Sequence, residues 1–512
     1  MYSLSYCAAI RGIEGCIIQV EADVSDGLPN FSLVGYLSSE VKEARERVRI
    51  AVKNAGFRLP PKKITVNLSP ADIRKDGTGY DLAIAVAILT AFGYVSQDFI
   101  KDIVFLGELS LEGKIKSVHG ILPMVYTAYE NGKKYCILPK DNLREASVVK
   151  GIKAIGVSDL QEVIAILQTE TIPEQETISP FDDGHQKCSS DFRDVIGQKM
   201  VRRAVEVAVA GMHNLLLIGP PGSGKTMIAK RIPGIMPDME FEEQMEISKI
   251  YSVAGLLSSS TPFVKERPFR DPHHTITQKA LIGGGQVPKP GEISLASGGV
   301  LFLDELPEFQ RQTIEILRQP LEEGSVNISR LDGNYRYPAK FQLVAAMNPC
   351  HCGYYPNRKK CTCTDWQIKR YLQKVSQPML DRMDICVETL PLEYQELHGN
   401  EKNNTGEDSA SIRKRVVAAQ KIQTRRYRKE SFFHNSHLTP SLIKKYCILT
   451  REASEYISDA FEKMDFSARV YHKILKVSRT IADLEGSTRI EKRHIAEAVC
   501  YRTIDKKYWS ED

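Results

Sequence analysis

The chain has 512 residues and a formal net charge of +5, from 69 Lys and Arg against 64 Asp and Glu. This length allows several domains whose cores need no covalent staples. The charge is too mild to assign nucleic-acid binding from composition, so local clusters must carry that assignment. Eleven cysteines, and a start (MYSLSYCAAIRGIEG) without a signal-peptide pattern, favour a reducing, cytoplasmic setting. The longest apolar run, 82–92, is too short to span a membrane.

The amino-terminal part, 1–167, alternates strand-like and helical runs. Strands are predicted at GCIIQVEADV, KITVNL, DIVFLGEL and KYCILP, and helices at SSEVKEARERVRIAVKNAG, DLAIAVAILTAFG and ILPMVYTAYENG. The alternation predicts an α/β or α+β domain. Residues 168–190 are rich in Glu, Thr, Ser and Pro and have no apolar period, which predicts a linker.

The central part, 191–391, contains the near-continuous apolar runs NLLLIG, GVLFLDE and FQLVAAMN. Runs of this kind are typical of strands buried on both faces of a parallel sheet. A polar stretch opens the last part, 392–512, which has helical periodicity and few strand signals. The expected fold class is therefore multidomain α/β with an α-helical carboxy-terminal domain.

A phosphate-binding loop is the strongest motif in the chain. GPPGSGKT follows the strand NLLLI and opens the helix TMIAKRI, which is the context that the Gly-x-x-x-x-Gly-Lys-Thr pattern requires. Its backbone N–H groups and helix dipole favour an anion. Lys225 is expected to reach the β- and γ-phosphates of ATP, and Thr226 to ligate Mg²⁺. The predicted nucleotide-binding residues are Gly219, Pro220, Pro221, Gly222, Ser223, Gly224, Lys225, Thr226 and Asp304.

Two further strand ends carry polar residues suited to nucleotide hydrolysis. VLFLDE ends in Asp304, expected to bind Mg²⁺, and Glu305, expected to activate water. FQLVAAMN ends in Asn348, either a water-positioning amide or a turn former before Pro349.

These motifs, followed by MLDRMDICVE (379–388), resemble an AAA+ ATPase with a P-loop core and a helical lid. The resemblance implies that Arg382 reaches the nucleotide of a neighbouring subunit, and that Arg469, in DFSARVYHKILKVSRTIADLEG, is the sensor 2 arginine. The alternative for Arg382 is a surface salt bridge.

A finer resemblance rests on RPFRDPHHTITQKALIGGGQVPKPGEISLASGGVLFLDELPEF (267–309), ILRQPLEEG and NPCHCG. These segments are similar to the magnesium-chelatase-like ATPases of the YifB/ComM type. That family implies a hexameric ring that acts on DNA during branch migration in natural transformation. ALIGGGQ (280–286) is either a loop projecting into the ring's pore or a tight structural turn.

The amino-terminal part resembles the Lon-type protease domain in GLPNFSLVGYLSSEVKEARERVRIAVKNAGF and ITVNLSPADIRKDGTGYDLAIAVAIL. The resemblance places Gly79 where that family has its nucleophilic Ser, and Leu122 where it has the activating Lys. Neither substitute supports the chemistry, so the fold is expected without proteolysis.

Four cysteines form two Cys-x-Cys pairs, separated by eight residues. Cys350, Cys352, Cys361 and Cys363 suit a structural, tetrahedral Zn²⁺, with free or redox-labile thiols as the alternative. His351 is a substitute ligand or simply exposed. Because a closed Cys₄ site leaves no position for water, the cluster is interpreted as a brace for the basic, aromatic loop that contains Tyr354, Tyr355 and RKK (358–360).

The stretch 411–430 carries eight Lys or Arg against one Glu. It is either a DNA-binding face or a solvated helix surface. The preferred function is an ATP-driven DNA helicase or translocase in a homo-oligomeric ring, with no membrane partner. The alternative is a magnesium-chelatase-like motor that remodels a protein partner.

Overall fold

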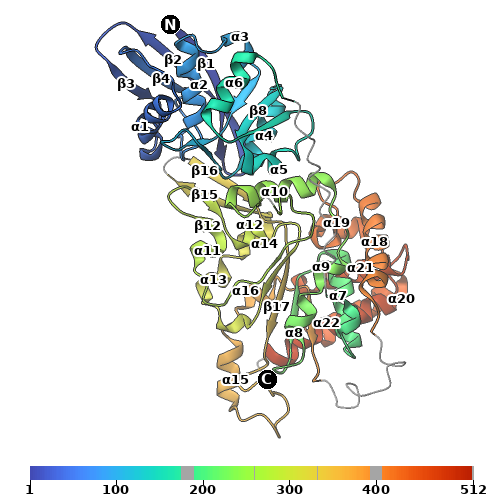
Figure 1. Ribbon diagram of the computed structural model, residues 1–512. Coiled ribbons are helices and arrows are strands. Elements are labelled where there is room, and N and C mark those ends of the chain that lie inside the picture. Colours follow the sequence, from blue (N-terminus) through green and yellow to red (C-terminus); the bar gives the residue numbers. More distant parts are fainter. Residues whose placement is uncertain (174–189, 259, 331–332, 392–405, 510–512) are drawn as a thin grey trace.

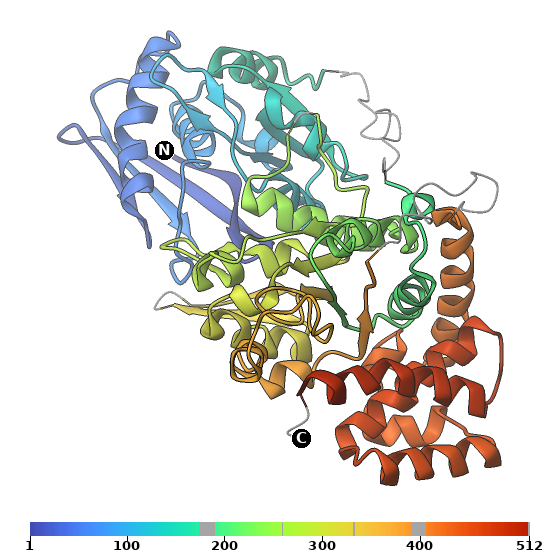
Figure 2. The same cartoon turned by 90° about the horizontal axis from the view of Figure 1, so that it is seen from below.

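The computed structural model describes residues 1–173, 190–258, 260–330, 333–391 and 406–509, and three parts follow one another along it (Figure 1). Figure 2 shows the carboxy-terminal helices packed beside the central sheet, on the side away from most of the amino-terminal part. Most of the predicted linker 168–190 and most of the polar stretch that opens the last part lie outside the described residues.

The amino-terminal part is built on a mixed sheet of seven strands in the order β3-β4-β2-β1-β5-β8-β9. The strands β5, β8 and β9 are parallel, and β1 and β2 form an antiparallel pair. The strands are β1 (Tyr2–Arg11), β2 (Glu14–Ser25), β3 (Asn30–Val34), β4 (Lys63–Ser69), β5 (Ile103–Phe105), β8 (Tyr135–Pro139) and β9 (Lys153–Val157), with the small hairpin β6 (Glu108–Leu109) and β7 (Ile115–Lys116). The helices are α1 (Ser39–Asn54), α2 (Asp81–Ala91), α3 (Gln97–Ile100), α4 (Ile121–Glu130), α5 (Leu143–Ala146) and α6 (Leu160–Thr169).

Helix α2 forms the centre of this part, and all its residues are buried. Its one charged residue, Asp81, would be costly to bury alone. Arg47 from α1 donates to it through Nε at 2.8 Å and Nη2 at 3.0 Å. The predicted apolar helix is therefore a core helix, whose only buried charge is paired.

The central part is a parallel sheet of five strands in the order β11-β14-β17-β10-β18. Its strands are β10 (Leu215–Ile218), β11 (Phe269–Arg270), β14 (Val300–Leu303), β17 (Gln342–Met347) and β18 (Ile385–Glu388). Two hairpins are appended, β12 (Gly283–Gly284) with β13 (Lys289–Pro290), and β15 (Ser325–Arg330) with β16 (Gly333–Pro338). The α-helices are α7 (Lys199–Gly211), α8 (Lys225–Ala229), α9 (Ile232–Ile235), α10 (Phe241–Ala254), α11 (Gln278–Ile282), α12 (Glu292–Leu295), α13 (Arg311–Glu315), α14 (Arg318–Glu323), α15 (Asp365–Leu372) and α16 (Gln377–Leu380).

The three apolar runs predicted strands that are buried on both faces, as is typical of a parallel sheet. β10, β14 and β17 consist entirely of buried residues. Their carboxyl ends share one edge, so the three polar segments that follow them converge there.

The carboxy-terminal part consists of α18 (Ser409–Arg426), α19 (Pro440–Tyr446), α20 (Arg451–Lys463), α21 (Ala468–Leu484) and α22 (Lys492–Trp509). Two buried contacts fix it to α7 and the residues after it. Gln423 donates to the Ala210 carbonyl at 2.9 Å, and the ring Nε2 of His213 lies 2.7 Å from the Thr480 hydroxyl. These helices and the central sheet share one apolar core.

The amino-terminal part rests on α10 and on the hairpin β15–β16 (Figure 1). The Gly120 N–H donates to the Ser252 carbonyl at 3.1 Å. The buried carboxylate of Glu145 accepts from the Leu122 N–H at 3.0 Å and from the Ser252 hydroxyl. Burial raises the pKa of Glu145. Leu122 therefore shares the Glu145 carboxylate with Ser252 of the central part. Leu122 is the residue that the Lon resemblance aligned with the lysine of the catalytic dyad.

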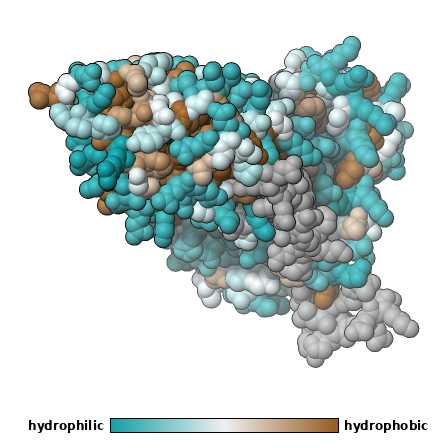
Figure 3. All heavy atoms as spheres, turned by 45° about the horizontal axis from the view of Figure 1, so that its top comes forward, coloured by the Kyte–Doolittle hydropathy of each residue, from teal (hydrophilic) through white to brown (hydrophobic). Residues whose placement is uncertain are grey.

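The face over the amino-terminal part is mostly hydrophilic, with hydrophobic atoms in scattered patches (Figure 3). Within the described ranges, no helix combines the length and the apolar character needed to cross a lipid bilayer.

Candidate functional site

The phosphate-binding loop connects β10 to α8 over residues 219–224. Gly224 caps α8 with φ +83°, a left-handed conformation that favours glycine. Gly219 lies so close to β18 that an added Cβ would be 2.0 Å from the Thr389 hydroxyl oxygen. The Ser223 hydroxyl bonds to the same Thr389 hydroxyl, at 2.7 Å. The loop is therefore held against the end of β18 by a contact that only glycine permits.

Lys225 is buried at the first position of α8. Its Nζ donates to the carbonyls of Gly219 at 2.8 Å and Pro220 at 2.9 Å, and to Asn348 Oδ1 at 3.1 Å. Burial lowers the pKa of this ammonium group, and the carboxylates of Asp304 and Glu305 oppose the effect. The structure thus brings together the predicted lysine and the predicted strand-end asparagine.

Thr226 and Asp304 form a second direct contact, with the Thr226 hydroxyl donating to Asp304 Oδ2 at 2.6 Å. A hydroxyl next to a carboxylate at a phosphate-binding loop is an oxygen donor set of the kind that Mg²⁺ takes. The two residues therefore fit the predicted magnesium site.

Glu305 follows Asp304 in a left-handed conformation, with φ +52°, which is uncommon for a residue other than glycine. Its carboxylate is mostly exposed, and its Oε2 lies 3.7 Å from the ring Nδ1 of His274. The backbone conformation turns the side chain away from the buried strand end.

The sequence analysis did not predict that the segment after β11 lies at the same carboxyl edge of the central sheet. It contains His274 and also Asp271, whose pKa is raised by burial and by the neighbouring Asp304 carboxylate. The signal was present in RDPHHT, because β11 lies beside β14 in the sheet and its carboxyl end meets the same edge.

The two predicted arginines each bind a carboxylate of their own chain. Arg382 is mostly buried and donates to the Pro378 carbonyl at 2.6 Å and to the Glu322 carboxylate. Arg469 is 74% exposed and pairs with Asp381 Oδ2 at 3.0 Å. Asp381 directly precedes Arg382 in the sequence, so Arg469 binds the residue next to Arg382. Within the described residues, no hydrogen bond or ion pair joins either side chain to the phosphate-binding loop.

The four predicted cysteines also converge, with all their sulfur atoms within 4.8 Å of one another. The Sγ atoms of Cys350 and Cys361 are 3.8 Å apart, and those of Cys352 and Cys361 are 3.5 Å apart. Tetrahedral zinc with Zn–S bonds of about 2.3 Å places its sulfurs about 3.8 Å apart. All four are free thiols, so the cluster fits a structural zinc ion.

The cysteine-bearing loop packs on its neighbours through its other side chains. The ring of His351 lies 4.6 Å from that of Tyr371 and outside the sulfur cluster. The ring of Tyr355 meets that of Tyr508 on α22 at 6.0 Å. The loop is thus anchored to α15 and to the last helix.

The basic stretch 411–430 divides into paired and unpaired cations on and just after α18. Three arginines are engaged with carboxylates of the same chain: Arg413 with Asp238, Arg415 with Glu206 and Glu407, and Arg426 with Asp483. The others are exposed and form no ion pair with a described residue: Lys414, Lys421, Arg425, Arg428 and Lys429. Three of the eight cations are therefore engaged by carboxylates of the chain itself, and five are not.

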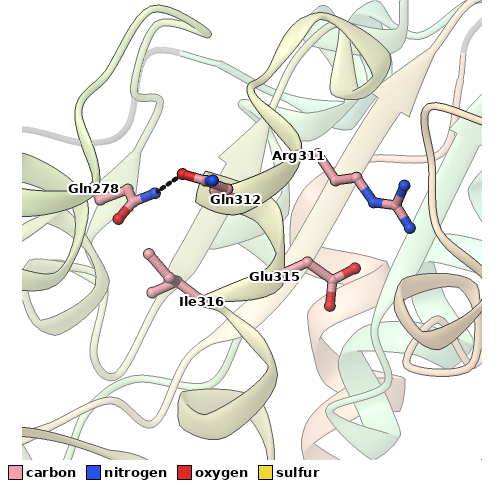
Figure 4. Close-up of a pocket in the computed structure, with 5 residues that line it drawn as sticks. All are labelled: Gln278, Arg311, Gln312, Glu315 and Ile316. Carbon is pink, nitrogen blue, oxygen red and sulfur yellow. Dashed lines mark hydrogen bonds between the residues drawn. The ribbon is translucent and has the colours of Figure 1, made fainter.

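An open pocket of about 420 Å³ lies away from the phosphate-binding loop, between α11 and α13 (Figure 4). Gln278 and Gln312 are joined across it by a hydrogen bond of 3.1 Å. Arg311 and Glu315 extend from one side of α13 (Figure 4). Its lining residues include no glycine of the 219–224 loop.

Comparison with known proteins matches three models of one family. The model described as magnesium chelatase, subunit ChlI, matches residues 191–397, and those for subunit ChlI of Mg-chelatase and the ChlI carboxy-terminal region match residues 20–142 and 406–502. Part of the amino-terminal region is also similar to a Lon protease of Trichlorobacter lovleyi, 25% identical over 170 residues, which is 31% of this chain and 21% of that protein.

Similarity to two full-length relatives covers almost the whole chain. It is 42% identical over 510 residues to the competence protein ComM of Haemophilus influenzae, spanning 98% of this chain and 97% of that one. It is 41% identical over 504 residues to YifB of Escherichia coli, with the same coverage. The chain therefore belongs to the magnesium-chelatase-like family that includes ComM and YifB.

Proposed function

We propose that the protein is an ATP-hydrolysing AAA+ motor that assembles into a hexameric ring and acts on DNA as a helicase or translocase. The ATPase activity is supported by two hydrogen bonds at the carboxyl edge of the central sheet. One joins Lys225 to Asn348, and the other joins Thr226 to Asp304. Kinship over the full chain with a protein named for competence supports DNA as the partner. Branch migration during transformation or recombination is the process that this combination suits.

Each residue at the carboxyl edge of the central sheet has a separate role in ATP hydrolysis. The loop N–H groups and Lys225 bind the phosphates, so the lysine exchanges its present carbonyl partners for phosphate oxygens. Thr226 and Asp304 would hold Mg²⁺, which would supply positive charge beside the phosphates. Glu305 accepts the proton of the attacking water, and Asn348 orients that water.

The arginines complete a site in a neighbouring subunit. Within the described residues, neither Arg382 nor Arg469 bonds to its own phosphate loop, as expected of groups that act across an interface. Arg382 stabilises the charge that develops on the transferred phosphoryl group, and Arg469 binds the same nucleotide.

The test is ATP hydrolysis without DNA and with single-stranded DNA, duplex or a four-way junction, at moderate and high salt. Stimulation by single strands or junctions, weakened by salt, is expected because phosphate contacts depend on counterion release. A Lys225→Ala preparation measures contaminating ATPase. An equal rate under all conditions, with hydrolysis intact, contradicts the DNA motor and favours the remodelling of a protein partner.

A further inference from the structure

Arg382 and the phosphate-binding loop of its own subunit lie at opposite ends of β18. Arg382 precedes Ile385, the first residue of the strand, by three positions. Thr389, directly after the strand, bonds to the Ser223 hydroxyl of the loop at 2.7 Å. Each residue of a strand adds about 3.3 Å, so the length of β18 separates Arg382 from its own loop.

The backbone carbonyl that follows Arg382 is held by two cations of the carboxy-terminal helices. The Met383 carbonyl accepts from Lys473 Nζ of α21 at 2.8 Å and from Arg502 Nη1 of α22 at 2.7 Å. Arg502 is buried and Lys473 is partly buried. Hydrogen bonds from charged donors are about twice as strong as neutral ones. The peptide unit after Arg382 is therefore fixed from outside the central sheet.

The backbone at and before Arg382 is held as well. The carbonyl of Arg382 accepts from the Asn214 side chain, at the start of β10, at 2.9 Å. Arg469 of α21 donates to Asp381 at 3.0 Å, but this arginine is 74% exposed, so solvent screens the pair. The buried contacts at the Met383 carbonyl are therefore the stronger link between Arg382 and the carboxy-terminal helices.

The side chain of Arg382 rests on the central part. Its guanidinium donates to the Pro378 carbonyl of α16 at 2.6 Å and to the Glu322 carboxylate of α14. A guanidinium that stabilises charge on a phosphoryl group must be placed accurately, since a displacement of about 1 Å can cost about 10²-fold in rate. The placement of its backbone therefore affects what Arg382 can reach.

We propose that Lys473 and Arg502 are positioning residues for Arg382. By holding the Met383 carbonyl, they keep the guanidinium of Arg382 where it meets the ATP of the neighbouring subunit. This inference rests on the proposed function, in which Arg382 acts across an interface. Both cations bond at the end of β18 that is remote from the phosphate-binding loop, so their removal should lower kcat and leave the KM for ATP nearly unchanged.

Lys476 provides a matched control for Lys473. It lies three residues further along α21, is also partly buried, and also donates to a carbonyl at 2.8 Å, that of Ser436. Burial raises the pKa of the Asp384 carboxyl and both lysines lower it, so either substitution removes a cation from that environment. Only Lys473→Met frees the Met383 carbonyl from one of its donors.

The experiment measures kcat and KM for ATP, without DNA, in single variants and in a double variant of the full chain. Lys473→Met is expected to lower kcat about tenfold with KM within about twofold of wild type, and Lys476→Met to keep kcat within about twofold. In Lys473→Met with Arg382→Ala, the lysine substitution should cost nothing beyond Arg382→Ala alone. Residues that act through one another are non-additive in this way.

Mixed rings test the direction of the effect. Lys473→Met subunits mixed with Lys225→Ala subunits should recover part of the hydrolysis, because the Lys225→Ala subunit presents a correctly held Arg382 to its neighbour. A general defect of the Lys473→Met subunit would instead impair its own nucleotide site, and mixing would restore nothing.

The outcomes separate this inference from the proposed function. Equal losses in Lys473→Met and Lys476→Met, additive losses in the double variant, or no recovery in mixed rings overturn the positioning role and leave the ATPase standing. If Arg382→Ala hydrolyses ATP at the wild-type rate, the proposed role of Arg382 falls, and this inference falls with it.

Arg502→Lys is the second variant if Lys473→Met does not fold. It keeps a cation on α22 but replaces the planar guanidinium with a shorter-reaching ammonium group. It too must lower kcat with KM nearly unchanged, and it too must cost nothing further when combined with Arg382→Ala. A wild-type kcat in Arg502→Lys, or an additive loss, overturns the inference.

Discussion

Gly353 of the cysteine-bearing loop lies against Pro221 of the phosphate-binding loop, so closely that an added Cβ would be 2.3 Å from Pro221 Cδ. Cys350, in the same loop, follows Asn348 by two residues. The cysteine-bearing loop therefore packs against the phosphate-binding loop through Gly353, and it follows Asn348 directly in the sequence. We therefore expect the cysteine-bearing loop to affect nucleotide binding without contacting the nucleotide.

Gly353→Ala is expected to weaken ATP binding, because the new methyl group displaces Pro221. Gly353 also has φ +83°, so alanine costs about 1–2 kcal/mol through the backbone alone. Gly486→Ala is the matched control, since Gly486 has φ +71° and an added Cβ there meets nothing within 4 Å. Titration with a fluorescent ATP analogue should show a larger Kd only for Gly353→Ala. Equal effects would mean that backbone strain, not contact, explains the loss.

Removing the metal from the cysteine cluster is expected to weaken nucleotide binding as well as stability. Cys361→Ser deletes one of four sulfurs that lie within 4.8 Å of one another, whereas Cys500→Ser changes an exposed thiol outside the cluster. Elemental analysis should find about one zinc per chain in wild type and in Cys500→Ser, and much less in Cys361→Ser. Metal-free wild-type protein with full ATP affinity would contradict the brace.

Lys225→Ala and Glu305→Gln should separate binding from hydrolysis. Lys225 supplies the buried ammonium at the loop, so its loss should abolish nucleotide binding. Glu305→Gln keeps the site but removes the proton acceptor, so ATP should bind and hydrolysis should fall about 10²-fold or more. Glu308→Gln, whose carboxylate pairs with Lys374 at 3.1 Å, is the control. Hydrolysis at the wild-type rate in Glu305→Gln would refute the assignment of the base.

The residues that meet at the carboxyl edge of the central sheet were predictable from the sequence. The carboxyl ends of parallel strands lie at one edge, however long the segments that connect the strands. Lys225, Thr226, Asp304 and Asn348 meet there for this reason. The four cysteines were predictable from spacing alone.

Contacts between appended segments were not predictable in this way. The hairpin bond from Arg330 to Gly285 joins residues 45 positions apart, and no periodicity encodes it. The same holds for the ion pairs that engage Arg415 and Arg426, since a basic helix has the same pattern whether its partners are phosphates or its own carboxylates. The place of Arg469 beside Asp381 likewise depends on how the carboxy-terminal helices dock.

Lys473 should make stability depend on alkaline pH. Burial lowers the pKa of its ammonium group to about 8 from 10.5, and the nearby Asp384 carboxylate limits the shift. Its Nζ donates to the Met383 carbonyl at 2.8 Å. Between about pH 8 and 10.5 the unfolded chain binds the extra proton, so this group's contribution to the free energy of unfolding rises with pH, by on the order of 1 kcal/mol.

Lys473→Met removes that titration. The thermal midpoint of wild type, measured against that of Lys473→Met, should therefore rise between pH 8 and pH 10. A difference between the two midpoints that stays constant with pH would show that the lysine does not titrate in this range.

Mixed rings should show that Arg382 and Arg469 serve the same neighbouring site. Rings of Arg382→Ala or of Arg469→Ala alone should hydrolyse ATP poorly. Mixing either with Lys225→Ala subunits should restore part of the activity, because the Lys225→Ala subunit still offers both arginines to its neighbour.

The mixture of Arg382→Ala with Arg469→Ala is the decisive one. If both arginines act across the interface, every interface in it lacks one of them, and hydrolysis stays low. If Arg469 acts within its own subunit, an Arg382→Ala site facing the Arg382 of an Arg469→Ala subunit is complete, and activity returns. The ion pair of Arg469 with Asp381, next to Arg382, favours the first outcome. Steady-state ATPase at equal subunit ratios, with ring assembly checked by light scattering, distinguishes the two.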